Sequence, residues 1–227
     1  MWWKKKFQNV QVQNKFMIKR VFIFFVLISF IFILTGCSKK TEENNNEQKN
    51  MALKDKKIAV IIPFVNYRDE EFDIPNKIFQ KNGIKVVTFS SQPGEATGKM
   101  GGKAKINFLL PELEVSNFDA IVFVGGPGAV IFQDDDDAHR IAQDTVKENK
   151  ILAAICVAPA ILAKAGVLQD KRVTAWTSYV DTEAIDILQK GGASFVDEEV
   201  VRDGNIITAN GPAAAESFAN AIIEALK

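Results

Sequence analysis

Short apolar runs alternate with amphipathic segments along most of the chain after residue 55. The runs are nearly continuous, which is typical of strands that are covered on both faces. They predict strands at 57–63, 84–90, 119–124, 151–155, 172–176, 194–201 and 205–209. Between them, helical spacing predicts helices at 69–81, 136–149, from Pro159 onward, 181–189 and 213–226. This alternation favours an α/β fold with a doubly wound, mostly parallel sheet.

Two segments depart from this regular pattern. Pro75 lies inside the first predicted helix, so we expect that helix to start later or to be kinked there. Residues 92–105 are rich in Gly and Lys and predict a hairpin or an exposed loop. In doubly wound sheets ligands bind beyond the carboxyl ends of the strands, so the turns that follow the strands are the places to look for chemistry.

The turn after the strand at 151–155 carries Cys156. A buried strand, a sharp turn and a helix that begins near Pro159 are the context of a nucleophile elbow. The start of a helix favours a thiolate, which predicts a lowered thiol pKa. A buried structural cysteine is the alternative, and this stretch alone does not decide between the two.

Two further turns could serve the same thiol. An oxyanion hole would use the amide of Val157 and one from Gly125-Gly126, although these glycines alone also fit a plain turn. The first helix opens with Asp69, Glu70 and Glu71, and for any one of them a water-facing position is the simpler interpretation. A carboxyl placed beside a thiolate would instead hold a proton and donate a hydrogen bond to sulfur.

Composition excludes several classes of function. The formal net charge is zero over 227 residues, which gives no electrostatic argument for nucleic-acid binding. His139 is the one histidine of the sequence, and its charged neighbours predict a solvated surface position. The Asp134–Asp137 run lacks the alternating spacing of a calcium loop and reads as a solvated helix entry. We therefore expect no metal site and no disulfide between the two cysteines, Cys37 and Cys156.

The N-terminal region reads as a targeting signal. Residues 21–34 are apolar, basic residues precede them, and the tetrad L-T-G-C follows. This tetrad resembles a bacterial lipobox, which implies that 1–36 is a signal peptide and that Cys37 carries acyl chains. A single membrane-spanning anchor is the alternative, but the run is short for that role. We expect Met17 to be the true start, with 1–16 an upstream extension.

Residues 37–54 then form a lipidated, polar tether between the anchor and a folded domain at 55–227. This arrangement predicts a bacterial membrane protein that is anchored by lipid and faces the extracytoplasmic side.

Together the motifs resemble the ThiJ/PfpI family of the class I glutamine-amidotransferase-like superfamily. The similar stretches are A-A-I-C-V-A-P-A, V-F-V-G-G-P-G-A, Y-R-D-E-E-F and N-I-I-T-A-N-G-P-A-A-A-E-S-F-A. The resemblance implies a three-layer flavodoxin-like sandwich with a cysteine nucleophile elbow, usually dimeric, and no cofactor. It also implies Cys156 as the reactive thiol and Glu71 as its hydrogen-bond partner. Where members of the family carry a catalytic histidine, this chain has Val157 or Trp176.

The resemblance implies several activities. The first is a thiol enzyme that acts on small carbonyl compounds or glycated thiols and amines. The second is a redox sensor or chaperone whose Cys156 reacts with an oxidant. A peptidase is disfavoured by the missing histidine, and a binding module without thiol chemistry also stays open.

Overall fold

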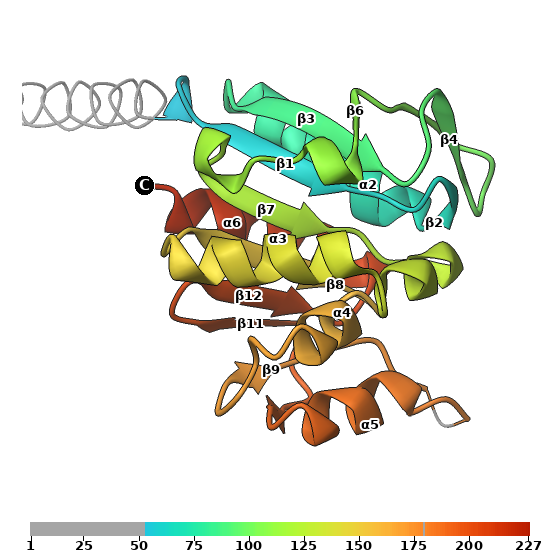
Figure 1. Cartoon of the computed structure of the whole chain (residues 1–227), viewed down its shortest axis with the longest axis vertical. Helices are drawn as coiled ribbons and strands as arrows, with labels where there is room; N and C mark the ends of the chain where they lie inside the picture. The colour runs from blue at the N-terminus through green and yellow to red at the C-terminus, as the bar shows by residue number, and fades with distance from the viewer. Residues whose placement is uncertain (1–52, 179) are drawn as a thin grey trace, which may run out of the picture. The chain divides into compact units, whose positions relative to one another are not determined.

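The structure, a computed structural model, describes residues 53–178 and 180–227. Its main sheet has seven strands in the order β11-β12-β8-β7-β1-β3-β6 (Figure 1). These strands, in chain order, are β1 (Lys57–Ile61), β3 (Lys85–Ser90), β6 (Phe108–Leu109), β7 (Ala120–Phe123), β8 (Ile151–Ile155), β11 (Val200–Asp203) and β12 (Ile206–Ala209). All neighbours are parallel except β11 and β12, which form an antiparallel hairpin. The predicted mostly parallel sheet is confirmed.

Helices cover both faces of this sheet. They are α2 (Asp69–Lys81), α3 (Asp136–Lys147), α4 (Pro159–Lys164) and α6 (Ala215–Ala225), whereas α5 (Glu183–Lys190) packs against α4. In Figure 1, α3 and α4 lie in front of the sheet, and α2 and α6 lie behind it. The three-layer sandwich that was predicted is therefore present.

The two-residue period of a strand explains why β1 is apolar after its first residue, Lys57. Ile58 and Val60 pack in the core beneath α2 and α6, whereas Ala59 and Ile61 pack in the core beneath α3 and α4. Both sets are almost fully buried. Because both faces of the strand are covered, a polar side chain at any of these four positions would be buried. This explains the continuous apolar run in the sequence.

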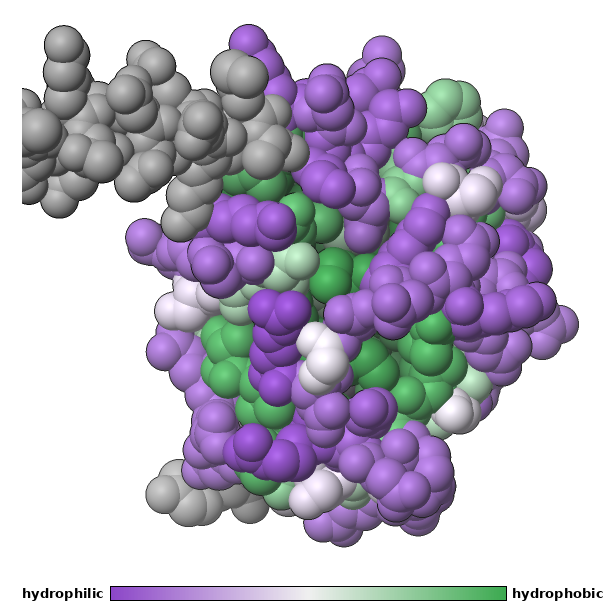
Figure 2. Space-filling view, turned by 90° about the vertical axis from the view of Figure 1, so that its left-hand side faces the viewer, coloured by the Kyte–Doolittle hydropathy of each residue, from purple (hydrophilic) through white to green (hydrophobic). Residues whose placement is uncertain are grey.

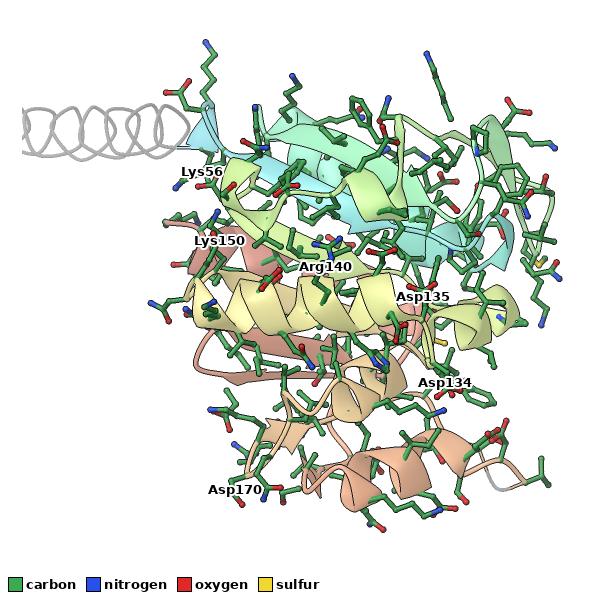
Figure 3. All side chains as sticks on the ribbon, viewed as in Figure 1. Lys56, Asp134, Asp135, Arg140, Lys150 and Asp170 are labelled. Carbon is green, nitrogen blue, oxygen red and sulfur yellow. The ribbon has the colours of Figure 1, made fainter. Side chains whose placement is uncertain are left out.

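Charged side chains cap α3 and form an ion pair near its start. At the start of α3, the Asp135 carboxylate accepts a hydrogen bond of 2.8 Å from the Ala138 amide and caps the helix (Figure 3). Asp134 pairs with Lys164 at 3.0 Å, so the acidic run is a helix entry as predicted. Figure 2 shows the side at which β1 and β7 begin, where hydrophilic residues surround smaller apolar areas.

Two strand predictions were wrong in extent. The segment 172–176 forms only β9 (Arg172–Val173), because the Thr174 amide donates to the Thr208 hydroxyl at 2.9 Å instead of to a strand. The segment 194–201 divides into β10 (Ser194–Phe195) and β11, since a turn at Glu198 interrupts it. β9 and β10 pair with each other outside the main sheet.

The remaining differences concern α2 and the edge of the sheet. α2 begins at Asp69, so a later start was wrong; Pro75 costs one backbone hydrogen bond, and its ring is buried in the core. The segment 92–105 forms the predicted hairpin, made of β4 (Glu95–Gly98) and β5 (Lys103–Lys105). β2 (Val65–Tyr67), which was not predicted, joins this hairpin in a small sheet.

Candidate active site

Cys156 stands at the tip of a sharp turn, directly after β8. Its φ is +67°, in the left-handed region that residues with side chains rarely adopt. Its amide donates to the Ala209 carbonyl at 2.9 Å, and its carbonyl accepts from the Trp176 amide at 2.8 Å. α4 begins three residues later at Pro159. The predicted strand–turn–helix is present, and neighbouring strand ends hold the strained residue in place.

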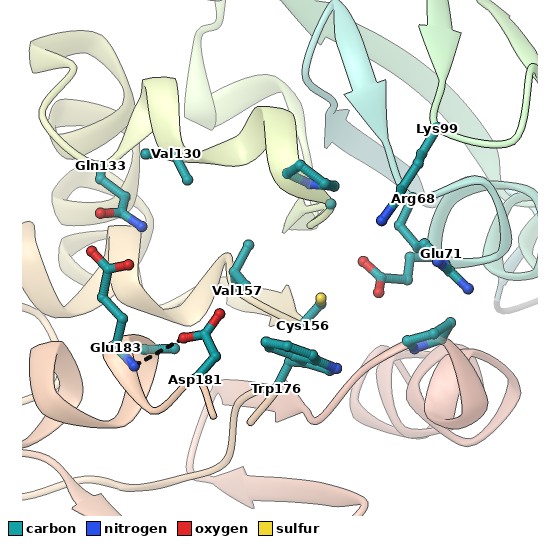
Figure 4. Close-up of a pocket in the computed structure, with 14 residues that line it drawn as sticks. Arg68, Glu71, Lys99, Val130, Gln133, Cys156, Val157, Trp176, Asp181 and Glu183 are labelled. Carbon is teal, nitrogen blue, oxygen red and sulfur yellow. Dashed lines mark hydrogen bonds between the residues drawn. The ribbon is translucent and has the colours of Figure 1, made fainter. Parts of the chain in front are cut away.

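Glu71 lies in the first turn of α2, and its side chain extends toward this thiol. It is fully buried, and its Oε2 accepts a hydrogen bond of 3.1 Å from the Gly125 amide. The carboxyl lies beside the thiol, and the contact affects the pKa of both groups (Figure 4). The structure thus brings together the carboxyl and the thiol that the family resemblance pairs.

Glycine is required at position 125. A Cβ there would lie 2.6 Å from the Cβ of Cys156 and 2.7 Å from Oε2 of Glu71, which is closer than real side chains approach. The amides of Gly126 and Val157 hydrogen-bond toward the sulfur. Of the backbone donors expected around the thiol, Gly126 and Val157 face it, whereas the Gly125 amide is used by Glu71.

Burial dominates the electrostatics of the pair. It raises the pKa of Glu71 from its ordinary 4.5 to about 7, even though the thiol and the Gly125 amide act in the opposite direction. Burial, followed by the negative charge of Glu71, also raises the pKa of the Cys156 thiol. The expected lowering of the thiol pKa is therefore wrong, because the thiol is only 8% exposed and desolvation outweighs two amide donors.

The acidic residues beside Glu71 lie in different surroundings. Asp69 is buried and accepts two backbone hydrogen bonds, so a water-facing position was wrong for it, as it was for Glu71. Glu70 lies nearer the surface and pairs with Arg68, with 2.8 Å between Oε2 and Nε.

A pocket of about 430 Å³ opens above the pair. Its apolar lining includes Pro127, Val130, Val157, Trp176 and Pro212. Figure 4 places Arg68 and Lys99 on the Glu71 side of the thiol, and Asp181 and Glu183 on the opposite side. The two cationic side chains thus lie on the same side as Glu71, and Asp181 and Glu183 lie across the thiol from them.

No imidazole lines this pocket within the described residues. His139 is half-buried rather than fully solvated, and its Nε2 lies 2.8 Å from the carbonyl oxygen of Gln133. Trp176, which was singled out only as a replacement for histidine, is one wall of the pocket. Lys99 and Asp181 were not predicted as site residues. Lys99 lies in the turn between β4 and β5, and Asp181 lies just before α5. No sequence motif marks either position.

The structure does not test every predicted feature of the chain. Cys37 and the segment 21–34 lie outside the described residues. None of the helices in the described parts has the length and apolar character needed to cross a membrane. In those same parts, no three His, Cys, Asp or Glu side chains gather into a metal-binding group.

The raised pKa of Glu71 predicts a pH-dependent cost to stability. Between pH 4.5 and 7 the folded state holds this proton while the unfolded state releases it. The wild type should therefore lose about 3 kcal/mol of unfolding free energy relative to Glu71→Gln as the pH rises through this window. Urea denaturation at each pH measures the difference. Glu70→Gln is the matched control and should keep the pH dependence, because Glu71 remains; a constant difference between wild type and Glu71→Gln would contradict the burial argument.

Comparison with known proteins shows which family this chain belongs to. The solved structure of a ThiJ/PfpI domain protein from Brachyspira murdochii superposes with a TM-score of 0.71 at 35% identity, covering 75% of this chain and 95% of that one. An uncharacterized protein from Methanocaldococcus jannaschii is 32% identical over 203 residues, which is 89% of this chain and 95% of the relative. Protein/nucleic acid deglycase 2 from Escherichia coli is 32% identical over 160 residues, 69% of this chain and 90% of the relative. The DJ-1/PfpI family model matches residues 56–225, and the chain belongs to that family.

Proposed function

We propose that this protein is a thiol-dependent enzyme that acts on small carbonyl compounds or on glycated thiols and amines. The observation that carries the proposal is the buried contact between Glu71 and Cys156 at the floor of a pocket. A relative whose name describes a deglycase supports the same class of reaction. The pocket is large enough for a compound of a few carbon atoms and one charged group.

Glu71 serves as the base for the first step. Its pKa of about 7 is near the working pH, which is the condition for efficient general acid–base catalysis. Ionised Glu71 accepts the thiol proton while the sulfur forms a bond to the aldehyde carbon. The carbonyl π electrons move to oxygen, and protonated Glu71 returns the proton there. The product is a hemithioacetal, and the reverse sequence releases the carbonyl compound.

A 2-oxoaldehyde such as methylglyoxal can go further with the same two residues. Glu71 removes the proton from the carbon bonded to sulfur, and the ketone oxygen gains a proton, which gives an enediol. A proton then returns to the former ketone carbon, and the hydroxyl group on the first carbon loses its proton and becomes the thioester carbonyl. The first carbon is thereby oxidised to a thioester and the second is reduced to an alcohol. Water then hydrolyses the thioester to the hydroxy acid and frees the thiol. The amides of Gly126 and Val157 stabilise the negative charge that develops beside the sulfur.

A redox sensor is the second candidate, and the lack of an imidazole in the pocket favours it. In that case an oxidant converts Cys156 to a sulfinic acid, which accepts a hydrogen bond from protonated Glu71. A peptidase stays disfavoured because its acyl-enzyme chemistry normally needs a histidine base. Turnover of a carbonyl substrate separates the enzyme from the sensor.

We also propose that the domain is anchored to the extracytoplasmic side of a bacterial membrane through lipid on Cys37. The support is the L-T-G-C tetrad after an apolar run and the polar segment that follows it. More than one acyl chain on this cysteine would give stable anchoring.

Activity assays test the enzyme directly. We expect wild-type protein to convert methylglyoxal to lactate, Cys156→Ser to abolish conversion, and Glu71→Gln to lower kcat/KM by about 10² to 10⁴. His139→Gln is the matched control and should leave the rate unchanged, because this imidazole does not line the pocket. Absence of turnover in the wild type, together with oxidation of Cys156 by peroxide, would replace the enzyme with the sensor.

Metabolic labelling tests the anchor. We expect full-length protein expressed in a bacterium to incorporate an alkyne analogue of palmitate and to sediment with membranes. Cys37→Ser should lose both properties, whereas the control Cys156→Ser should keep them. Label that persists in Cys37→Ser would contradict the lipoprotein assignment.

A further inference from the structure

The hairpin of β4 and β5 is fastened to the start of α2 by one carboxylate. Asp69 is only 8% exposed, and its two oxygens accept hydrogen bonds of 2.7 Å from the amides of Met100 and Gly102. Gly98 and Gly102 pack so closely against this carboxylate that a Cβ at either position would collide with it. The turn at 98–102 is therefore held in one place next to the active-site helix.

This turn carries Lys99 into the pocket that contains the thiol. The Lys99 amide donates to the Tyr67 carbonyl at 2.8 Å, which fixes its backbone a second time. Its ammonium group has no ion-pair partner among the residues that the structure describes. Arg68, the neighbouring cation, is already bound through two nitrogens to Glu70, at 2.8 and 3.1 Å. Among the described residues that line the pocket, Lys99 is thus the cation whose charge is still available for a ligand.

The opposite side of the pocket repels an anion. Asp181 and Glu183 are exposed there, and the Asp181 carboxylate already accepts the Glu183 amide at 3.2 Å (Figure 4). On the near side, Oε1 of Glu71 is fully buried, so the charge that a ligand meets there is that of Lys99, which is exposed. A ligand with one anionic end therefore has a preferred direction, with that end at Lys99 and its reactive carbon near the sulfur.

We propose that Lys99 selects carbonyl substrates that bear a carboxylate, and that Asp69 is the residue that positions Lys99. The substrate class is an aldehyde or 2-oxoaldehyde with an acid group a few bonds from the carbonyl. This inference rests on the proposed function for the reaction, but the charge selection is testable without any turnover.

A pair of alkylating reagents measures this selection at the thiol itself. Iodoacetate and iodoacetamide have nearly the same size and differ in charge, so the ratio of their rates at Cys156 reports how well the pocket accepts an anion. Mass spectrometry of the tryptic peptide 151–164 follows Cys156 separately from Cys37 in the full chain. We expect Lys99→Met to lower the ratio of iodoacetate to iodoacetamide about three- to tenfold. Lys105→Met, on the same hairpin but not lining the pocket, is the matched control and should leave the ratio unchanged.

Asp69→Asn tests the positioning role. The amide keeps one acceptor oxygen, so the hairpin stays attached but loses one of its two hydrogen bonds. We expect a smaller fall of the same ratio, with the iodoacetamide rate held near that of the wild type. General damage to the fold would change both rates together and leave their ratio constant, which would overturn the role of Asp69.

Turnover separates this inference from the proposed function. We expect Lys99→Met to raise the ratio of KM for 4,5-dioxopentanoate, a 2-oxoaldehyde that bears a carboxylate, to KM for methylglyoxal about tenfold. If wild type turns over both compounds and Lys99→Met affects neither KM nor the alkylation ratio, the inference fails and the proposed function stands. If wild type turns over neither compound, the proposed function fails, and a lowered alkylation ratio in Lys99→Met still supports anion selection.

Discussion

The buried contact between Glu71 and Cys156 is the constraint on which the site depends. Glu71 is fully buried, and burial disfavours the ionised form of a carboxyl group, so the pKa of Glu71 rises to about 7. A thiol beside it keeps its proton for the same reason, because burial and the carboxylate both oppose the thiolate. In the proposed mechanism, the pair therefore acts as an acid and a base that exchange one proton, rather than as a permanently ionised nucleophile. Gly125 makes the contact possible, since any side chain there would separate the two groups.

The parallel sheet supplies the geometry that this contact needs. The carboxyl ends of β1, β7 and β8 lie side by side, so the loops after them meet at one edge. α2 brings the carboxyl from the first loop, Gly125 lies in the second, and Cys156 forms the third. The same helix start also fixes a hairpin through Asp69, and this places a lysine in the lining of the pocket that contains the thiol. Two neighbouring acidic residues thus have separate tasks, one in the pair and one in holding the pocket wall.

Much of this could be predicted from the sequence, and the reasons for the failures are physical. Continuous apolar runs identified the central strands and the turn at Cys156, because burial on both faces leaves a strong local pattern. The pairing with Glu71 came from the family resemblance, since nothing local distinguishes it from Asp69. The direction of the thiol pKa was wrong because desolvation is set by tertiary packing, whereas the helix start is visible locally. Lys99 was missed because its position depends on hydrogen bonds that neighbouring amides donate to Asp69, a residue distant in the sequence.

The most direct test is the rate of iodoacetamide alkylation of Cys156 as a function of pH, in wild type and in Glu71→Gln. If ionised Glu71 accepts the thiol proton, the wild-type rate rises with a midpoint near pH 7, the pKa of the carboxyl. In Glu71→Gln this step disappears and the rate follows only the thiol's own ionisation at higher pH. The same profile in both proteins would show that Glu71 does not share a proton with Cys156, and would contradict the account.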